Sequence, residues 1–218
     1  MGRKPLPKQR TLDTEIRREW LKKLMPFFTK YGFSSIRMDE MAVQVGVSKA
    51  TFYKHFISKE DLISSLLKWK IEEISGYMPM LLDSTTGFAE RYFKAVEISL
   101  IGLGGISNVL LSDLEREYPE LHKQLATFQK LNLKVLGEFY TEARNAGFLK
   151  SSIDVKTLLI MEELILLQIT DPNYLKQKQI TLKDFFVKYL HIRSEAIVAD
   201  FTPQMRAYFA QLEKKLHV

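Results

Sequence analysis

The chain has 218 residues and no cysteine. It can therefore form no disulfide, no thiolate metal site and no cysteine nucleophile. It also lacks an apolar run long enough to cross a bilayer, because the longest, near residues 157–170, is short and carries Glu162 and Glu163. No apolar signal-peptide core stands at the N-terminus. We therefore expect a soluble, cytoplasmic protein without a membrane partner.

Strand patterns and catalytic patterns are missing as well. No alternating β-branched segment is bounded by hairpin turns. The chain has 4 histidines, and no two of them have the spacing of helical metal ligands. No nucleophile, base and acid form a recognisable set, and the glycine-rich residues 101–108 follow no strand. The sequence thus predicts an all-α protein with no catalytic residue, no metal and no cofactor.

Positive charge is concentrated near the N-terminus. Residues 1–60 hold 13 lysines and arginines against 6 acidic residues, a net charge of +7, whereas the remainder has a net charge of −1. Such asymmetry indicates a polyanionic partner for this end, either nucleic acid or an anionic membrane. A solvated basic tail on an unrelated protein is the alternative. Residues 1–10 are expected to form a disordered basic arm.

Helix start signals recur along the chain. Ser58 and Thr181 each stand three residues before an acidic residue, which is the pattern of a capping box. Thr202 precedes a proline, which suits the first position of a helix. From these signals and the apolar periodicity we predict about ten helices, at residues 12–31, 38–45, 49–56, 59–80, 86–101, 107–116, 119–145, 155–170, 182–197 and 203–216.

Two of the predicted helices flank a turn at Gly46. In the first, an apolar stripe repeats at helical spacing. In the second, Phe52 and Phe56 are four residues apart and share the inward face, while Ser48 can cap its start. The outward face of the second helix then carries small and hydrogen-bonding residues. Two short helices joined by such a turn predict a helix-turn-helix.

In a helix-turn-helix the second helix enters the major groove of DNA. Ala50 permits close approach and can touch a thymine methyl group, and Lys54 can donate to guanine O6 and N7. Side chains that suit phosphate oxygens surround them, namely Thr51, Tyr53, His55 and Lys59. The alternative is that these residues are an ordinary solvated helix face.

The stretch "GFSSIRMDEMAVQVGVSKATFYKHFISKEDL", residues 32–62, resembles the DNA-binding domain of the TetR family of bacterial transcriptional regulators. The matching residues include Gly32, Phe33, Met41, Ala42, Gly46, Val47, Ser48, Thr51, Phe52, Tyr53, Phe56, Ser58, Lys59, Glu60 and Leu62. The resemblance implies a three-helix DNA-binding domain at residues 11–64. It also implies a larger helical domain at residues 65–218 for ligand binding and dimerisation.

By position, the resemblance implies that the DNA-facing residues are Ser48, Lys49, Ala50, Thr51, Tyr53, Lys54 and His55, with Lys59 as a phosphate contact. One departure concerns the start of the preceding helix, where the family usually has a threonine or serine that touches phosphate. This chain has Ile36 and Arg37 there, and Arg37 can reach a phosphate as a cation.

The aromatic stripes of the middle helices are most simply core. The resemblance also implies a pocket there for an unknown small molecule, and methionine and aromatic walls suit an apolar or aromatic ligand. The lining candidates are Tyr77, Met80, Tyr92, Phe93, Phe139 and Met161. Residues 157–170 are apolar on most of their circumference and should be buried on more than one side. The resemblance implies that they pair with a partner subunit, whereas burial within a monomer is the alternative.

The leading hypothesis is therefore a homodimeric regulator of a double-stranded, pseudo-palindromic operator. The resemblance implies a repressor that a small molecule releases, with an activator left open. A dimer is needed because two half-sites must be read together, at ~34–36 Å or a multiple of it. The second hypothesis is an all-helical enzyme or carrier for an apolar ligand, whose basic end binds an anionic membrane or substrate.

Overall fold

The computed structural model describes residues 14–216, which form twelve helices. In this part of the chain, β-pairing is limited to one bridge between Leu149 and Val198. The prediction of an all-α protein is confirmed, while the predicted arm at residues 1–10 lies outside the described residues. The helices are α1 (Thr14–Tyr31), α2 (Met38–Val45), α3 (Lys49–His55), α4 (Lys59–Ser75), α5 (Met78–Leu81), α6 (Phe88–Gly102), α7 (Asn108–Glu117), α8 (Pro119–Asn145), α9 (Val155–Ile169), α10 (Pro172–Gln177), α11 (Leu182–Ile197) and α12 (Pro203–Leu216).

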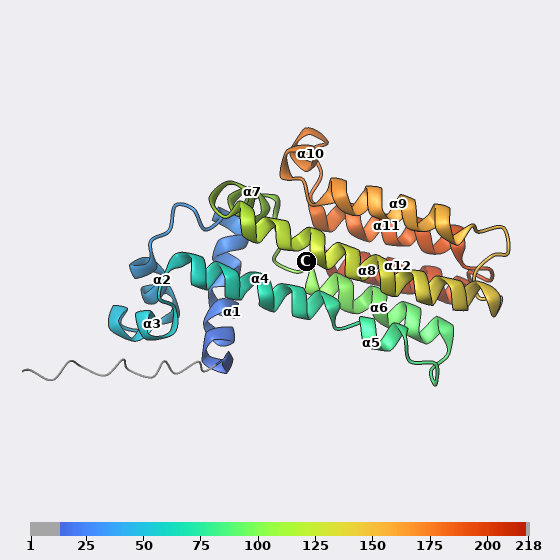
Figure 1. Ribbon diagram of the computed structural model, residues 1–218, viewed down its shortest axis with the longest axis horizontal. Coiled ribbons are helices and arrows are strands. Elements are labelled where there is room, and N and C mark those ends of the chain that lie inside the picture. Colours follow the sequence, from blue (N-terminus) through green and yellow to red (C-terminus); the bar gives the residue numbers. More distant parts are fainter. Residues whose placement is uncertain (1–13, 217–218) are drawn as a thin grey trace, which may run out of the picture.

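The molecule is elongated, with α1, α2 and α3 gathered at one end (Figure 1). Helix α4 leaves this end and runs into a body in which α6, α8, α9, α11 and α12 run along the long axis. The domain boundary expected between residues 64 and 65 falls within α4, which spans Lys59–Ser75. This helix is therefore a continuous connection between the two parts.

Two short helices differ from the predicted pattern. The helix predicted at 59–80 ends at Ser75, and α5 begins at Met78 with Pro79 in its first turn. Proline cannot donate a backbone hydrogen bond and clashes with the preceding turn, which explains the interruption. Helix α10 was missed, although Asp171 caps it by accepting from the amides of Asn173 and Tyr174.

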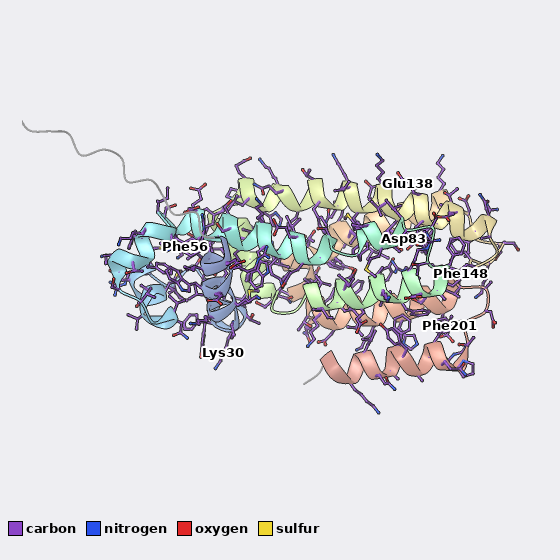
Figure 2. The ribbon with its side chains drawn as sticks, turned by 90° about the horizontal axis from the view of Figure 1, so that it is seen from below. Lys30, Phe56, Asp83, Glu138, Phe148 and Phe201 are labelled. Atoms are coloured by element: carbon purple, nitrogen blue, oxygen red, sulfur yellow. The ribbon has the colours of Figure 1, made fainter. Side chains whose placement is uncertain are left out.

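The core of the α1–α3 end is shared with the body. Aromatic and aliphatic side chains of α1 to α4 pack there with Leu110 and Leu114 of α7 and Leu121 of α8. Phe52 and Phe56 are fully buried in this cluster, and Figure 2 labels Phe56 at this end of the molecule. Because the apolar side chains form one continuous cluster, the position of α1–α3 depends on α7 and α8.

A buried carboxylate fixes the turn between α1 and α2. Oδ2 of Asp113 on α7 accepts from the backbone N–H of Phe33 at 2.7 Å and from that of Ser34 at 2.9 Å. Gly32 ends α1 with a φ of +72°, and a Cβ atom there would collide with the same carboxylate. The turn therefore requires glycine both for its left-handed backbone and for the close approach of Asp113.

Three further side chains hold Ser34. Arg116 donates to the Ser34 Oγ atom at 2.6 Å and pairs with Asp113 at 2.7 Å. Ser34 Oγ lies 3.0 Å from Glu117, and Lys59 donates to the Ser34 carbonyl at 2.7 Å. Hydrogen bonds from Ser34 and then Arg116 hold the pKa of Glu117 below its ordinary value. We call Asp113, Arg116, Glu117 and Lys59 around this turn the turn clamp.

The opposite end of α7 is tied to the segment that starts α11. The Asn108 side chain donates to the Ile180 carbonyl at 2.9 Å and accepts from the Leu182 amide at 3.2 Å. One side chain thus satisfies both a donor and an acceptor of that backbone. Helix α7 is consequently hydrogen-bonded to the body at its first residue and to the α1–α2 turn near its last.

The last helix, α12, covers the outside of the body. Figure 2 shows α12 along the outer side of the bundle. Its Phe209 is fully buried and stacks on His191 of α11 with ring centroids 4.9 Å apart. Tyr208 donates to the Phe93 carbonyl at 3.3 Å, so α12 is fixed to both α11 and α6.

Two glycine substitutions test the turn clamp. Gly32 and Gly46 both have left-handed backbones, but a Cβ atom at Gly46 would meet no atom of the described residues within 4 Å. We expect Gly46→Ala to lower the free energy of unfolding by about 1–2 kcal/mol, the cost of that backbone for alanine. Gly32→Ala should lower the free energy of unfolding by at least about 1 kcal/mol more than Gly46→Ala does, because it also breaks the hydrogen bonds to Asp113. Urea denaturation measures both, and equal losses would contradict the clamp.

Candidate functional site

The α2–turn–α3 unit has the geometry that its sequence predicts. Gly46 ends α2 with a φ of +82°, and the Ser48 side chain caps α3 by accepting from the Thr51 amide at 3.1 Å. The inward residues of both helices are buried, namely Met38, Met41, Ala42, Val45, Phe52 and Phe56. With these residues inside, the remaining side chains of α3 form its outward face.

The outward face of α3 presents Ala50, Tyr53 and Lys54 to solvent, with Thr51 half-buried at its edge. Lys49 is exposed and pairs with Asp39 of α2 at 2.8 Å. Because exposed ion pairs contribute little free energy, this ammonium can exchange Asp39 for a phosphate oxygen. Arg37 precedes α2 with its side chain 82% exposed, 3.7 Å from Glu40, and is similarly available.

Two residues predicted to face DNA also have partners inside the protein. The half-buried His55 ring lies 4.8 Å from the ring of Trp20, and its Nδ1 atom is buried without a hydrogen-bond partner among the described residues. Lys59 is half-buried in the turn clamp, and burial lowers the pKa of its ammonium. The ammonium uses one of its three N–H donors on the Ser34 carbonyl, so a phosphate contact by Lys59 would use the others.

A small cavity lies within the body. Its volume is about 40 Å³, which is room for one or two waters and far below the ~300–1,000 Å³ of typical ligand pockets. A ligand would therefore have to separate the surrounding helices. The cavity is lined by Tyr77, Leu81, Tyr92, Ala95, Val96, Ser99, Asn132, Leu136, Glu162, Leu166, Phe186, Leu190 and Arg193.

The structure places only part of the predicted lining at this cavity. Tyr77 and Tyr92 line it, while Phe139 is buried behind Tyr92 with the two rings 6.1 Å apart. Phe93 faces Tyr208 and Phe209 of α12 instead. Phe93 and Phe139 therefore do not line this cavity, and both rings are used in packing between helices; a contact of either with a ligand stays a prediction.

Met80 and Met161, the other two predicted pocket residues, do not line this cavity either. Met80 is half-buried but does not line the cavity. Met161 is 53% exposed, and the next residue, Glu162, is the one that points inward. The sequence of α9 is apolar around most of the helix, so its periodicity does not identify the inward face. A glutamate within such a helix was the available signal, because a buried charge needs a partner.

Polar groups missed by the sequence reasoning lie at the cavity wall. Glu162 of α9 pairs with Arg193 of α11 at 2.9 Å, and Tyr140 donates to the same carboxylate at 3.1 Å. The Tyr92 hydroxyl is 2.7 Å from Ser194 Oγ and accepts from Arg193 at 3.3 Å. On the other side of the cavity, the Tyr77 hydroxyl donates to Asn132. Glu162 and Arg193 lie on different helices, so their spacing in the sequence does not show that they form an ion pair.

An apolar face of α9 is exposed in the single chain. Ile160, Leu164 and Leu167 fall on one side of the helix and are 48–59% exposed. The alternative that α9 is internal core of a monomer is therefore contradicted. The described residues contain no group of three side chains that could together hold a metal ion. In the same part of the chain, no helix is long and apolar enough to cross a membrane.

The fold and the α2–α3 unit define a helix-turn-helix DNA-binding protein with a helical body. Similarity to known proteins identifies the family of this helix-turn-helix domain. Residues 25–66 match the family described as "Bacterial regulatory proteins, tetR family". The resemblance to the TetR family is thus confirmed, and the chain carries the helix-turn-helix domain of TetR-family transcriptional regulators.

Relatives and solved structures extend this likeness over the body. The "Fatty acid metabolism regulator protein" of Bacillus subtilis is 25% identical over 128 residues, which is 57% of this chain and 66% of the relative, just under two thirds of its length. A TetR-family regulator of Marinobacter aquaeolei VT8 shares the fold with a TM-score of 0.64 at 20% identity, covering 92% of this chain and 98% of its own.

A third similar protein has a ligand bound. FadR from Bacillus subtilis in complex with stearoyl-CoA has a TM-score of 0.53 at 19% identity, covering 83% of this chain and 98% of its own. The similar proteins are transcriptional regulators, and they support a ligand-responsive DNA-binding regulator over the enzyme or carrier hypothesis.

Proposed function

We propose that the chain is a homodimeric, cytoplasmic transcriptional regulator that binds a pseudo-palindromic operator and releases it when an apolar ligand enters the body. The observation that carries the proposal is the outward face of α3, where Ala50, Tyr53 and Lys54 are exposed on a helix whose phenylalanines are buried. Residues 11–64 form the proposed DNA-binding domain, and residues 65–218 form the proposed ligand-binding and dimerisation domain. We assign no catalytic activity to the chain.

In the proposed complex α3 lies in the major groove. Ala50 contacts a thymine methyl group and Lys54 donates to guanine O6 and N7. Phosphate oxygens on either side accept from the side chains around these two residues. The proposed phosphate ligands are Arg37, Ser48, Lys49, Thr51, Tyr53, His55 and Lys59.

The dimer is proposed to form through the exposed face of α9. Side chains such as Ile160, Leu164 and Leu167 lose exposed apolar area when a second copy covers them. A two-fold interface brings the same surface of each copy together. It also presents two α3 helices to successive major grooves, which is the requirement for reading a pseudo-palindrome.

The ligand is proposed to act by opening the cavity. The wall of the cavity includes Phe186, Leu190 and Arg193 of α11, and α11 begins at the segment held by Asn108 of α7. Movement of α11 would therefore displace α7 and, through the turn clamp, the α1–α2 turn. A ligand that prefers the displaced arrangement shifts the population away from the DNA-binding one, typically by ~1–3 kcal/mol.

Lysine substitutions test the DNA-binding assignment. Selection from a random duplex DNA library at fixed salt should enrich a pseudo-palindrome with the unmodified protein. Lys54→Ala should relax the preference at one base position of each half-site and cost about 1–3 kcal/mol for the selected sequence. Lys59→Ala should instead weaken all sequences about equally and reduce the salt slope by about 1.

Lys94→Ala serves as the control, because Lys94 is an exposed lysine of α6 that pairs only with Glu90 of the same helix among the described residues. It should leave both the selected sequence and the salt slope unchanged. Enrichment of no sequence by folded, dimeric protein would contradict the proposed function. An unchanged salt slope for Lys59→Ala would leave that lysine with its role in the turn clamp alone.

A charge placed on α9 tests the dimer. Leu164→Glu should convert the dimer to a monomer in sedimentation velocity, because it places a carboxylate in the middle of a desolvated interface. Ile101→Glu is the matched control, since Ile101 is 64% exposed but lies at the end of α6. It should leave the dimer intact. A dimeric Leu164→Glu protein would show that another face makes the interface.

A further inference from the structure

A buried ion pair lines the cavity beside its apolar side chains. The Glu162 side chain is 2% exposed and the Arg193 side chain 9%, and their closest atoms are 2.9 Å apart. Taking both charges out of water costs more free energy than an apolar pair of similar shape. Both residues line the cavity together with Tyr77 and Tyr92, so a ligand there would contact them.

The charges around the cavity cancel. Arg193 contributes one positive charge and Glu162 one negative charge. Burial raises the pKa of Tyr77 and of Tyr140, so these hydroxyl groups stay protonated and neutral. The Arg193 guanidinium also stays charged. Burial opposes its charge, but the nearby Glu162 carboxylate outweighs this and holds the pKa of Arg193 above its ordinary value.

One donor in this cluster has no acceptor. The Nε atom of Arg193 is buried and finds no hydrogen-bond partner among the described residues, although the Nη atoms contact Glu162 and Tyr92. An unsatisfied buried donor costs free energy, and a ligand oxygen that reaches it recovers that cost. Because Arg193 lines the cavity, a ligand acceptor that separates the surrounding helices can reach this donor, while the Arg193 charge stays paired with Glu162.

We infer that the cavity selects an apolar ligand whose buried polar group is an uncharged oxygen, such as a hydroxyl, ketone or ester carbonyl, and that Glu162 rejects free carboxylates. A ligand carboxylate would lose its hydration without gaining a free positive charge, because Glu162 already neutralises Arg193. A ligand ammonium would likewise find no free negative charge, because Arg193 neutralises Glu162. The inference rests on the proposed function, because it concerns the ligand of the same cavity.

Calorimetric titration with two probes of equal chain length tests this selectivity. At pH 8, 1-decanol is neutral and decanoate is fully ionised, since a carboxylic acid of this kind titrates far below that pH. The unmodified protein should bind 1-decanol at least about tenfold more tightly than decanoate. Equal binding, tighter binding of decanoate, or binding of neither probe would overturn the inference.

Substitutions of the ion pair then reverse or restore the preference. Glu162→Gln leaves Arg193 unpaired, so decanoate should become the tighter ligand. The double variant Glu162→Gln, Arg193→Met returns the cavity to zero charge and should again prefer 1-decanol. If Glu162→Gln does not fold, Arg193→Met tests the pair from the other side: it leaves Glu162 unpaired, so decanoate should bind still more weakly relative to 1-decanol, and an unchanged ratio would contradict the inference.

Glu142→Gln is the matched control, because Glu142 pairs with the buried Arg91 but does not line the cavity. It removes the same charge and should keep the preference for 1-decanol. A preference that does not change between the unmodified protein and Glu162→Gln would contradict the role of Glu162. Probe binding is measured without DNA, so its failure is distinguishable from failure to enrich a DNA sequence.

Discussion

The arrangement of the molecule depends on the carboxylate of Asp113. It is 5% exposed and accepts two backbone N–H groups at the turn that joins α1 to α2. Removing it would leave the buried Phe33 amide and the half-buried Ser34 amide without this partner, and an unsatisfied buried amide costs more than an ordinary hydrogen bond contributes. Because α2 and α3 follow this turn directly, Asp113 determines where the outward face of α3 lies relative to the body.

The turn clamp also explains how two parts with different tasks can influence each other. Helix α7 bonds through Asn108 to the start of α11 and through Asp113 to the α1–α2 turn. Leu110 and Leu114 of the same helix pack in the core of the DNA-binding end. A change in the position of α11 therefore has a continuous path of packed and hydrogen-bonded groups to α3. The proposed ligand and DNA sites lie in different parts of the molecule, and this path is a physical route by which one can affect the other.

The sequence predicted the local features well, because they depend on neighbours in the chain. The cap at Ser48, the left-handed turn at Gly46 and the buried pair Phe52 and Phe56 all follow from helical spacing. Tertiary contacts were not predictable in this way. Asp113 resembles any acidic residue of a solvated helix face, and Lys59 resembles a free phosphate ligand until the Ser34 carbonyl is placed beside it. Because α9 is apolar around most of its circumference, helical spacing did not predict that Glu162 points inward and Met161 outward.

The most direct test of this account is the distance between the two DNA-binding domains of a dimer, measured by pulsed electron spin resonance. Because the chain has no cysteine, Val43→Cys introduces a single label site per subunit, on an α2 side chain that is 78% exposed. We expect a narrow distribution of label distances in this background and a much broader one when Asp113→Ala is added, with the dimer and the helix content retained. Equally narrow distributions in both proteins would contradict the claim that Asp113 fixes the DNA-binding domain to the body.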